Sequence, residues 1–87
     1  MDSNYTKGKI RNALSALALG EGKLRRRVSA ACAELMVASY RIGFEKEFDR
    51  IGQIRTKVSA GDWTRVSDAE IRDIAVIILR LNERICD

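Results

Sequence analysis

Carboxylates, which could act on a substrate or bind a metal, gather in two clusters in this sequence. The clusters are Glu45, Glu47 and Asp49, and Asp68, Glu70 and Asp73. In the first, every second residue is acidic, and on a helix such neighbours point about 200° apart, so they do not converge on one substrate or metal. The second falls in the first turn of an expected helix, where the helix dipole favours negative charge. We interpret both clusters as solvated faces and helix caps.

Other catalytic and metal-binding residues are scarce. The sequence has no histidine, which excludes Ser-His-Asp and Cys-His catalysis and histidine metal ligation. Its two cysteines, Cys32 and Cys86, cannot close a structural zinc site without histidine, and we expect Cys32 to be a small core residue. Gly20-Glu21-Gly22 lacks the length and context of a nucleotide-binding loop. The sequence therefore predicts a protein that is not an enzyme and that uses no metal or cofactor.

Positive charge is unevenly distributed along the chain. The formal net charge is +4, with +5 on residues 1–43 and −1 on residues 44–87. The basic residues concerned are Lys7, Lys9 and Arg11, and Lys23, Arg25, Arg26 and Arg27. The second group falls at the start of an expected helix, where cations face the positive end of the dipole. Cations at this end of a helix are mildly destabilising, and residues that oppose a local structural preference in this way indicate a candidate functional site.

The second basic group predicts a cationic ridge on one helix face. On an ideal helix Lys23, Arg26 and Arg27 share an arc of about 100°, with Arg41 along the same face. Such a ridge suits an acidic protein surface or phosphates, while the competing interpretation is a merely solvated face. No aromatic residue is interleaved with these cations to stack bases, so nucleic acid is the less favoured ligand.

Two aromatic residues are alternative binding anchors, because Trp and Tyr are enriched in interface hot spots. They are Trp63 and Tyr40. A tryptophan just before a capped helix more often packs as a lid on the core, and we favour that role for Trp63.

The elements that must position these residues are predicted to be helices. Proline is absent, 46% of residues are hydrophobic, and helix formers predominate. A first helix is expected from about Thr6 to Leu19, closed by Gly20 in the left-handed conformation. A second begins near Lys23 and carries a heptad seam. The seam consists of Leu24, Val28, Ala31, Leu35, Ala38 and Ile42.

The apolar phase then shifts by two residues. The new stripe is Phe44, Phe48, Ile51, Ile54 and Val58. Gly43 sits at the shift, and either the helix breaks there or one long helix presents different faces to different partners. An unbroken helix over residues 23–59 would be about 55 Å long, whereas a compact chain of this length has a radius of gyration near 12 Å. We favour a break for a monomer; an unbroken helix would imply an intertwined oligomer.

The final helix has the clearest local signal. Ser67 and Glu70 form a capping box, which predicts a helix start at this point. Its apolar stripe is Ile71, Ile74, Ile78, Leu81 and Ile85, widened by Ala75, Val76, Ile77 and Leu79. A helix that is apolar nearly all round is buried on several sides. We expect the centre of a bundle or half of a dimer interface, and we predict a homodimer.

Together these patterns predict an all-α protein. We expect a single helical domain over residues 1–87, a bundle of three or four helices with the final helix (about 68–86) at its centre. The longest apolar run, Ile74 to Leu79, is too short to span a membrane, and the sequence of residues 1–4 lacks a secretory signal, so a cytoplasmic location is expected.

The functional expectation is a non-catalytic module that binds another protein or itself. Small bacterial and phage proteins that regulate or inhibit a larger partner offer a fold-level analogy. The alternative is a nucleic-acid-binding accessory protein that uses the basic helix face.

Overall fold

The computed structural model describes residues 3–37 and 43–85 and forms a bundle of four helices. They are α1 (Ser3–Leu19), α2 (Leu24–Met36), α3 (Glu45–Arg55) and α4 (Asp68–Ile85). Within these two ranges the only β pairing is an isolated bridge between Ser59 and Asp62, so the predicted all-α class is confirmed. None of the described helices is long and apolar enough to span a membrane. The expectations for Tyr40, Arg41 and Cys86 lie outside the described residues.

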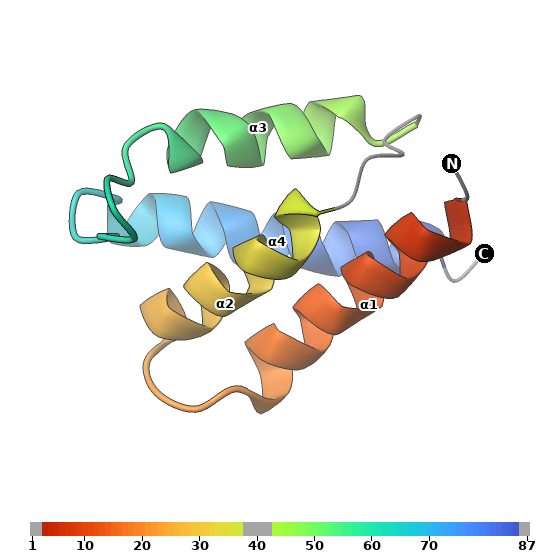
Figure 1. The fold of residues 1–87 in the computed structure, drawn as a ribbon, viewed down its shortest axis with the longest axis horizontal. Helices are drawn as coiled ribbons and strands as arrows, with labels where there is room; N and C mark the ends of the chain where they lie inside the picture. The colour runs from red at the N-terminus through yellow and green to blue at the C-terminus, as the bar shows by residue number, and fades with distance from the viewer. Residues whose placement is uncertain (1–2, 38–42, 86–87) are drawn as a thin grey trace.

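The bundle is organised around α4. This helix contacts all three others, as expected of a central helix. α1 and α2 form a helical hairpin against one side of α4, and α3 lies along another (Figure 1). The start of α1 and the end of α4 lie at the same end of the molecule (Figure 1).

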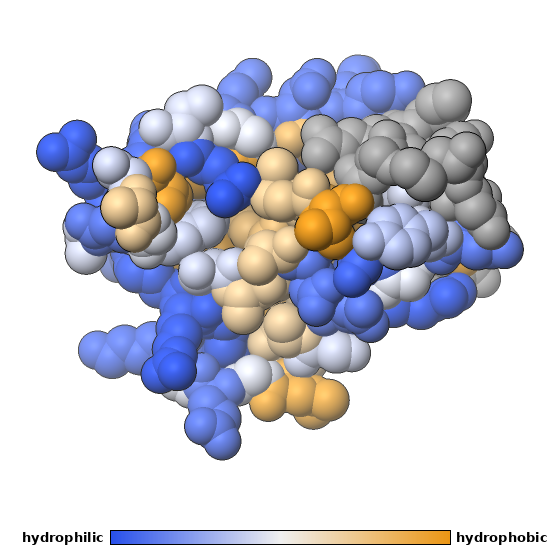
Figure 2. All heavy atoms as spheres, in the orientation of Figure 1, coloured by the Kyte–Doolittle hydropathy of each residue, from blue (hydrophilic) through white to orange (hydrophobic). Residues whose placement is uncertain are grey.

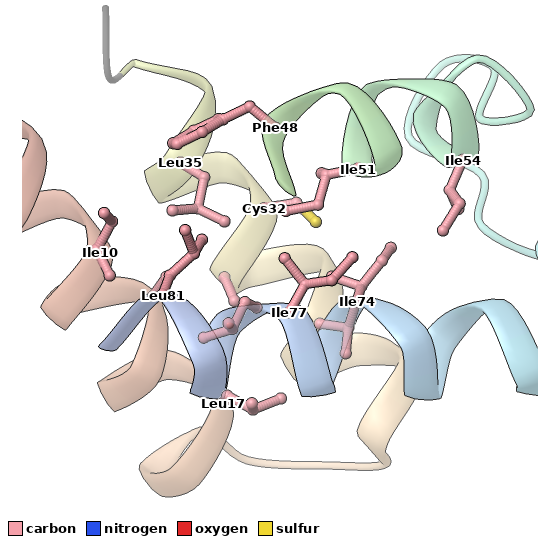
Figure 3. Packing of buried hydrophobic residues seen from close by; sticks show 14 of the residues in the cluster. Ile10, Leu17, Cys32, Leu35, Phe48, Ile51, Ile54, Ile74, Ile77 and Leu81 are labelled. Atoms are coloured by element: carbon pink, nitrogen blue, oxygen red, sulfur yellow. The ribbon is translucent and has the colours of Figure 1, made fainter. Parts of the chain in front are cut away.

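One hydrophobic core joins the four helices. Figure 3 shows side chains from every helix packed around α4. Those labelled are Ile10 and Leu17 of α1, Cys32 and Leu35 of α2, Phe48, Ile51 and Ile54 of α3, and Ile74, Ile77 and Leu81 of α4. Most described residues of the predicted stripes of α2, α3 and α4 are buried within one chain, so these residues do not require a second copy to cover them. Val76 and Leu79, which were expected to widen the buried surface of α4, are exposed.

A buried polar residue, which the sequence analysis did not identify, ties α4 to α1. The side-chain amide of Asn82 donates to the backbone carbonyl of Ile10 at 3.2 Å and to that of Ile78 at 2.9 Å. Because a buried amide is unfavourable without partners, these bonds favour one register of α1 against α4.

The end of α1 differs from the prediction. The left-handed conformation occurs at Gly22 (φ 91°) and not at Gly20, so that expectation was wrong. The Gly20 amide instead continues the helical pattern and donates to the Ala16 carbonyl at 3.0 Å. A Cβ at Gly20 would collide with that same carbonyl oxygen, so glycine is needed here for a close approach.

The chain breaks between α2 and α3, as favoured for a compact monomer. α2 ends at Met36, and Gly43 has a φ of 88°, a conformation that side chains other than glycine adopt with strain. The Gly43 amide donates to the Glu45 carboxylate at 2.9 Å, just before α3 begins. Ala38 and Ile42 of the predicted seam lie outside the described residues.

The loop before α4 is held by local side-chain caps. The Thr64 amide donates to Asp62 Oδ1 at 3.0 Å. The predicted capping box is confirmed, because the Glu70 amide donates to Ser67 Oγ at 3.1 Å and the Ser67 amide donates to Glu70 Oε1 at 3.0 Å. These caps fix the path of the chain around Trp63.

Candidate functional site

The first turn of α2 concentrates positive electrostatic potential. Its cap residue, Lys23, has an extended backbone and makes no side-chain capping bond, and the first turn contains no acidic residue. The first backbone amides of a helix have no partner within the helix, and they lie at the positive end of the dipole. Three consecutive arginines, Arg25 to Arg27, follow Lys23 after Leu24. Their side chains leave this turn in different directions.

Arg25 turns toward the loop before α4. Its guanidinium donates to the Trp63 carbonyl at 2.7 Å, to the Val66 carbonyl, and to Asp68 Oδ1 at 2.7 Å. The planar guanidinium presents several donors at fixed angles, which suits three acceptors at once. Arg25 therefore links the start of α2 to the loop before α4 and to the first residue of α4.

Arg27 turns toward the end of α1. One of its terminal nitrogens donates to the Leu17 carbonyl at 2.9 Å. The last carbonyls of a helix lack partners within it, and a cation there is favoured by the negative end of the dipole. The predicted ridge is therefore divided, since Arg27 is engaged in the fold instead of standing free beside Arg26.

Lys23 and Arg26 remain open to solvent. Both are exposed, and neither forms an ion pair with any residue in the described part of the chain. They border a groove of about 500 Å³, which we call the basic groove. Its lining residues are Gly22, Lys23, Arg25, Arg26, Ser29, Gly61 and Trp63. Hydrophilic side chains project from this region around the α1–α2 turn (Figure 2).

Trp63 forms part of the groove wall although it is remote from the cations in sequence. It is only 8% exposed, so the predicted role as a lid on the core is confirmed. Trp63 lines the groove together with the α2 cations. This juxtaposition was not predicted, because Trp63 lies 38 residues from Arg25 in the sequence and only the tertiary structure brings the two together.

A second hollow of about 280 Å³ adjoins the basic groove. Lys23 and Arg25 line both hollows, and the second also contains Asp68 and Arg72. The Asp68 carboxylate is paired with Arg25. Four cations thus border the two hollows together, against one carboxylate, and the region suits an anionic ligand.

The predicted basic residues of α1 do not join the groove. The Lys9 ammonium pairs with the Glu34 carboxylate at 3.3 Å and lies 5.5 Å from the centre of the Tyr5 ring. Lys7 and Arg11 do not line the groove either. Arg41 lies outside the described residues.

The carboxylate clusters have structural partners. Glu47 pairs with Arg84, Asp73 with Arg50, and Glu70 with Lys57. The hydrogen bond from Lys57, followed by that from the Ser67 amide, lowers the pKa of Glu70 to about 2. In the described part of the chain, no three His, Cys, Asp or Glu side chains gather as metal ligands would.

The described cysteine belongs to the core. Cys32 is 1% exposed and has a free thiol. Burial raises the pKa of this thiol to about 11, an effect that the charge of Arg55 only partly offsets. A thiol with such a pKa stays protonated near neutral pH and is a poor nucleophile. Cys32 is therefore a small apolar packing residue, as predicted.

Comparisons with protein families, with curated proteins and with solved structures found no match for this chain.

Proposed function

We propose that this protein is a non-catalytic docking module that binds an acidic segment of a larger protein in the basic groove. The observation that carries the proposal is the pair of unpaired cations, Lys23 and Arg26, which line the groove with the anchored Arg25 and with Trp63. Arg25 is already ordered by its bonds within the fold, so little side-chain freedom remains for it to lose on binding. By binding a larger protein, such a module would regulate or inhibit it in the cytoplasm.

The shape of the site favours a protein ligand over nucleic acid. A single-stranded nucleic acid uses aromatic faces on which successive bases stack, together with cations that track the phosphates. Trp63 is largely buried, and Lys7 and Arg11 of α1 do not extend the groove. A short acidic segment requires neither feature, because a few carboxylates can pair with the cations of a compact hollow.

The test uses charge reversal in the groove and a matched control elsewhere. Lys23→Glu with Arg26→Glu removes two groove cations, while Lys7→Glu with Arg11→Glu changes the net charge equally on α1. A carboxylate at position 23 is favoured by the dipole of α2, so the groove variant is expected to fold. Arg27 is left unchanged because it holds the end of α1.

The probes are a labelled oligoglutamate peptide and a labelled single-stranded DNA of the same net charge. We expect the wild type to bind the peptide more tightly, and the groove variant to lose about tenfold or more in affinity while the α1 variant changes little. Equal losses in both variants would show non-specific attraction. Tighter binding of the DNA, with a steep salt dependence that flattens in the groove variant, would support the nucleic-acid alternative. No binding of either probe would refute the groove as a site.

A further inference from the structure

Two large hydrophobic side chains are exposed side by side on α4. Val76 is 42% exposed and Leu79 is 47% exposed. Residues three apart on a helix are neighbours on its surface, so the two form one small apolar patch. The other exposed large hydrophobic residues of the described chain stand apart from it, with Tyr5 and Leu19 near the two ends of α1 and Val37 after α2.

Opposite charges flank this patch along the helix. Arg72 lies one turn before Val76, and Glu83 lies one turn after Leu79. Both are exposed, and neither forms an ion pair with another residue of the described chain. On an ideal helix the four residues fall within an arc of about 60°, and all four are exposed. We call this line of residues the outer stripe.

The outer stripe is complementary to the outer stripe of a second copy that runs in the opposite direction. Its spacings of four, three and four residues are symmetric about the midpoint between positions 77 and 78. If a second α4 lies antiparallel across it, Arg72 faces the partner's Glu83, Val76 faces the partner's Leu79, and both contacts occur twice. Isologous interfaces with a two-fold axis have this property. A parallel arrangement would instead place Arg72 against the partner's Arg72.

From this symmetry we infer that the protein forms an antiparallel homodimer through the outer stripe of α4. This surface differs from the stripe through Ile78 and Leu81 that suggested a dimer from the sequence, because both residues are fully buried inside one chain. A partner of one charge, such as a nucleic acid, would match only one end of the outer stripe. None of the four residues lines the basic groove, although Arg72 borders the adjoining hollow.

The test is the molecular mass in solution, measured by sedimentation equilibrium over a series of concentrations. The wild type is expected to approach twice the mass of one chain as concentration rises. Leu79→Lys places a charge in the centre of the interface and is expected to abolish the dimer. Leu19→Lys introduces the same charge at an exposed leucine of α1 and is expected to leave the mass unchanged.

Charge exchange tests the antiparallel arrangement. Arg72→Glu alone and Glu83→Arg alone each create two like-charge contacts, and each is expected to weaken the dimer by about tenfold. The double variant, with both exchanges, is expected to restore the affinity because every pair is again opposite in sign. Circular dichroism of each variant reports whether the fold is retained, and Leu79→Ala, which favours the helix, replaces Leu79→Lys if the latter unfolds.

The following outcomes would overturn the proposed dimer or its antiparallel arrangement. A wild type with the mass of one chain at all concentrations would overturn it. So would a dimer that is unaffected by Leu79→Lys or Leu79→Ala, since it would use another surface. Failure of the double exchange to restore affinity would overturn the antiparallel arrangement.

Discussion

The Arg25 guanidinium in the first turn of α2 donates a hydrogen bond of 2.7 Å to the backbone carbonyl of Trp63, 38 residues further along the chain. The same guanidinium also bonds the Val66 carbonyl and the Asp68 carboxylate. One side chain thereby joins two parts of the fold and holds the Trp63 backbone beside the start of α2, where Trp63 and the α2 cations line the same groove. Arg25 therefore contributes both to the stability of the fold and to the proposed docking site.

Removal of Arg25 is expected to destabilise the fold. Hydrogen bonds to charged groups contribute about 1.5–3 kcal/mol, so Arg25→Ala should lower the free energy of unfolding by about 2 kcal/mol. Arg25→Lys keeps the charge but cannot reproduce the planar set of donors, and it should recover only part of the loss. Urea denaturation measures both. Arg26→Ala is the control, expected within about 0.5 kcal/mol of the wild type because Arg26 is exposed. If Arg25→Ala matched the wild type, the anchoring role would be rejected.

Substitution of Leu81 is expected to lower the stability of the single folded chain and not to act at a dimer interface. Leu81 is fully buried between α4 and its neighbours, and Leu→Ala changes in cores cost about 2–5 kcal/mol. Leu81→Ala should lower the free energy of unfolding by that amount, and Leu81→Asp should unfold the protein. Thermal unfolding at low protein concentration, where any dimer is dissociated, measures this directly. Leu79→Ala is the matched control and should change stability little under those conditions. An effect of Leu81→Ala that disappears on dilution would instead place Leu81 at an interface.

Acid is expected to weaken the bond between Glu70 and Lys57. The pKa of Glu70 falls from its ordinary 4.5 to about 2 in the folded chain, chiefly through the hydrogen bond from Lys57 and then through that from the Ser67 amide. Ionised Glu70 therefore adds stability above its unfolded-state pKa, and this contribution is lost as the pH falls through the folded-state value. Glu70→Gln keeps an acceptor for the Ser67 amide but loses the charge.

Melting temperatures of wild type and Glu70→Gln across a pH series check this. At neutral pH the variant should melt below the wild type, and the difference should shrink between about pH 4.5 and pH 2. A difference that stays constant across this range would show that the charge of Glu70 is unimportant.

Much of the secondary structure was predictable because its signals are local. The capping box at Ser67 and Glu70 involves backbone groups three residues apart, so its sequence pattern nearly determines its geometry. The break near Gly43 was indicated by the shift in apolar phase, because a single straight helix could not turn both stripes toward one core. The role of Gly20 was not predicted, since several local conformations can end a helix.

The sequence by itself determined the helices, their buried stripes and the concentration of cations at the start of α2. Only the tertiary structure decided what each cation does. Arg25 and Arg27 donate to backbone carbonyls of other elements, because a loop and a helix end with unpartnered carbonyls lie within their reach. Lys23 and Arg26 remain exposed to solvent. Trp63 lies at the groove because the packed fold brings it beside cations that are distant from it in the sequence. Helical periodicity is a short-range property, whereas the partner of a long side chain depends on which distant backbone the packed core brings within its reach.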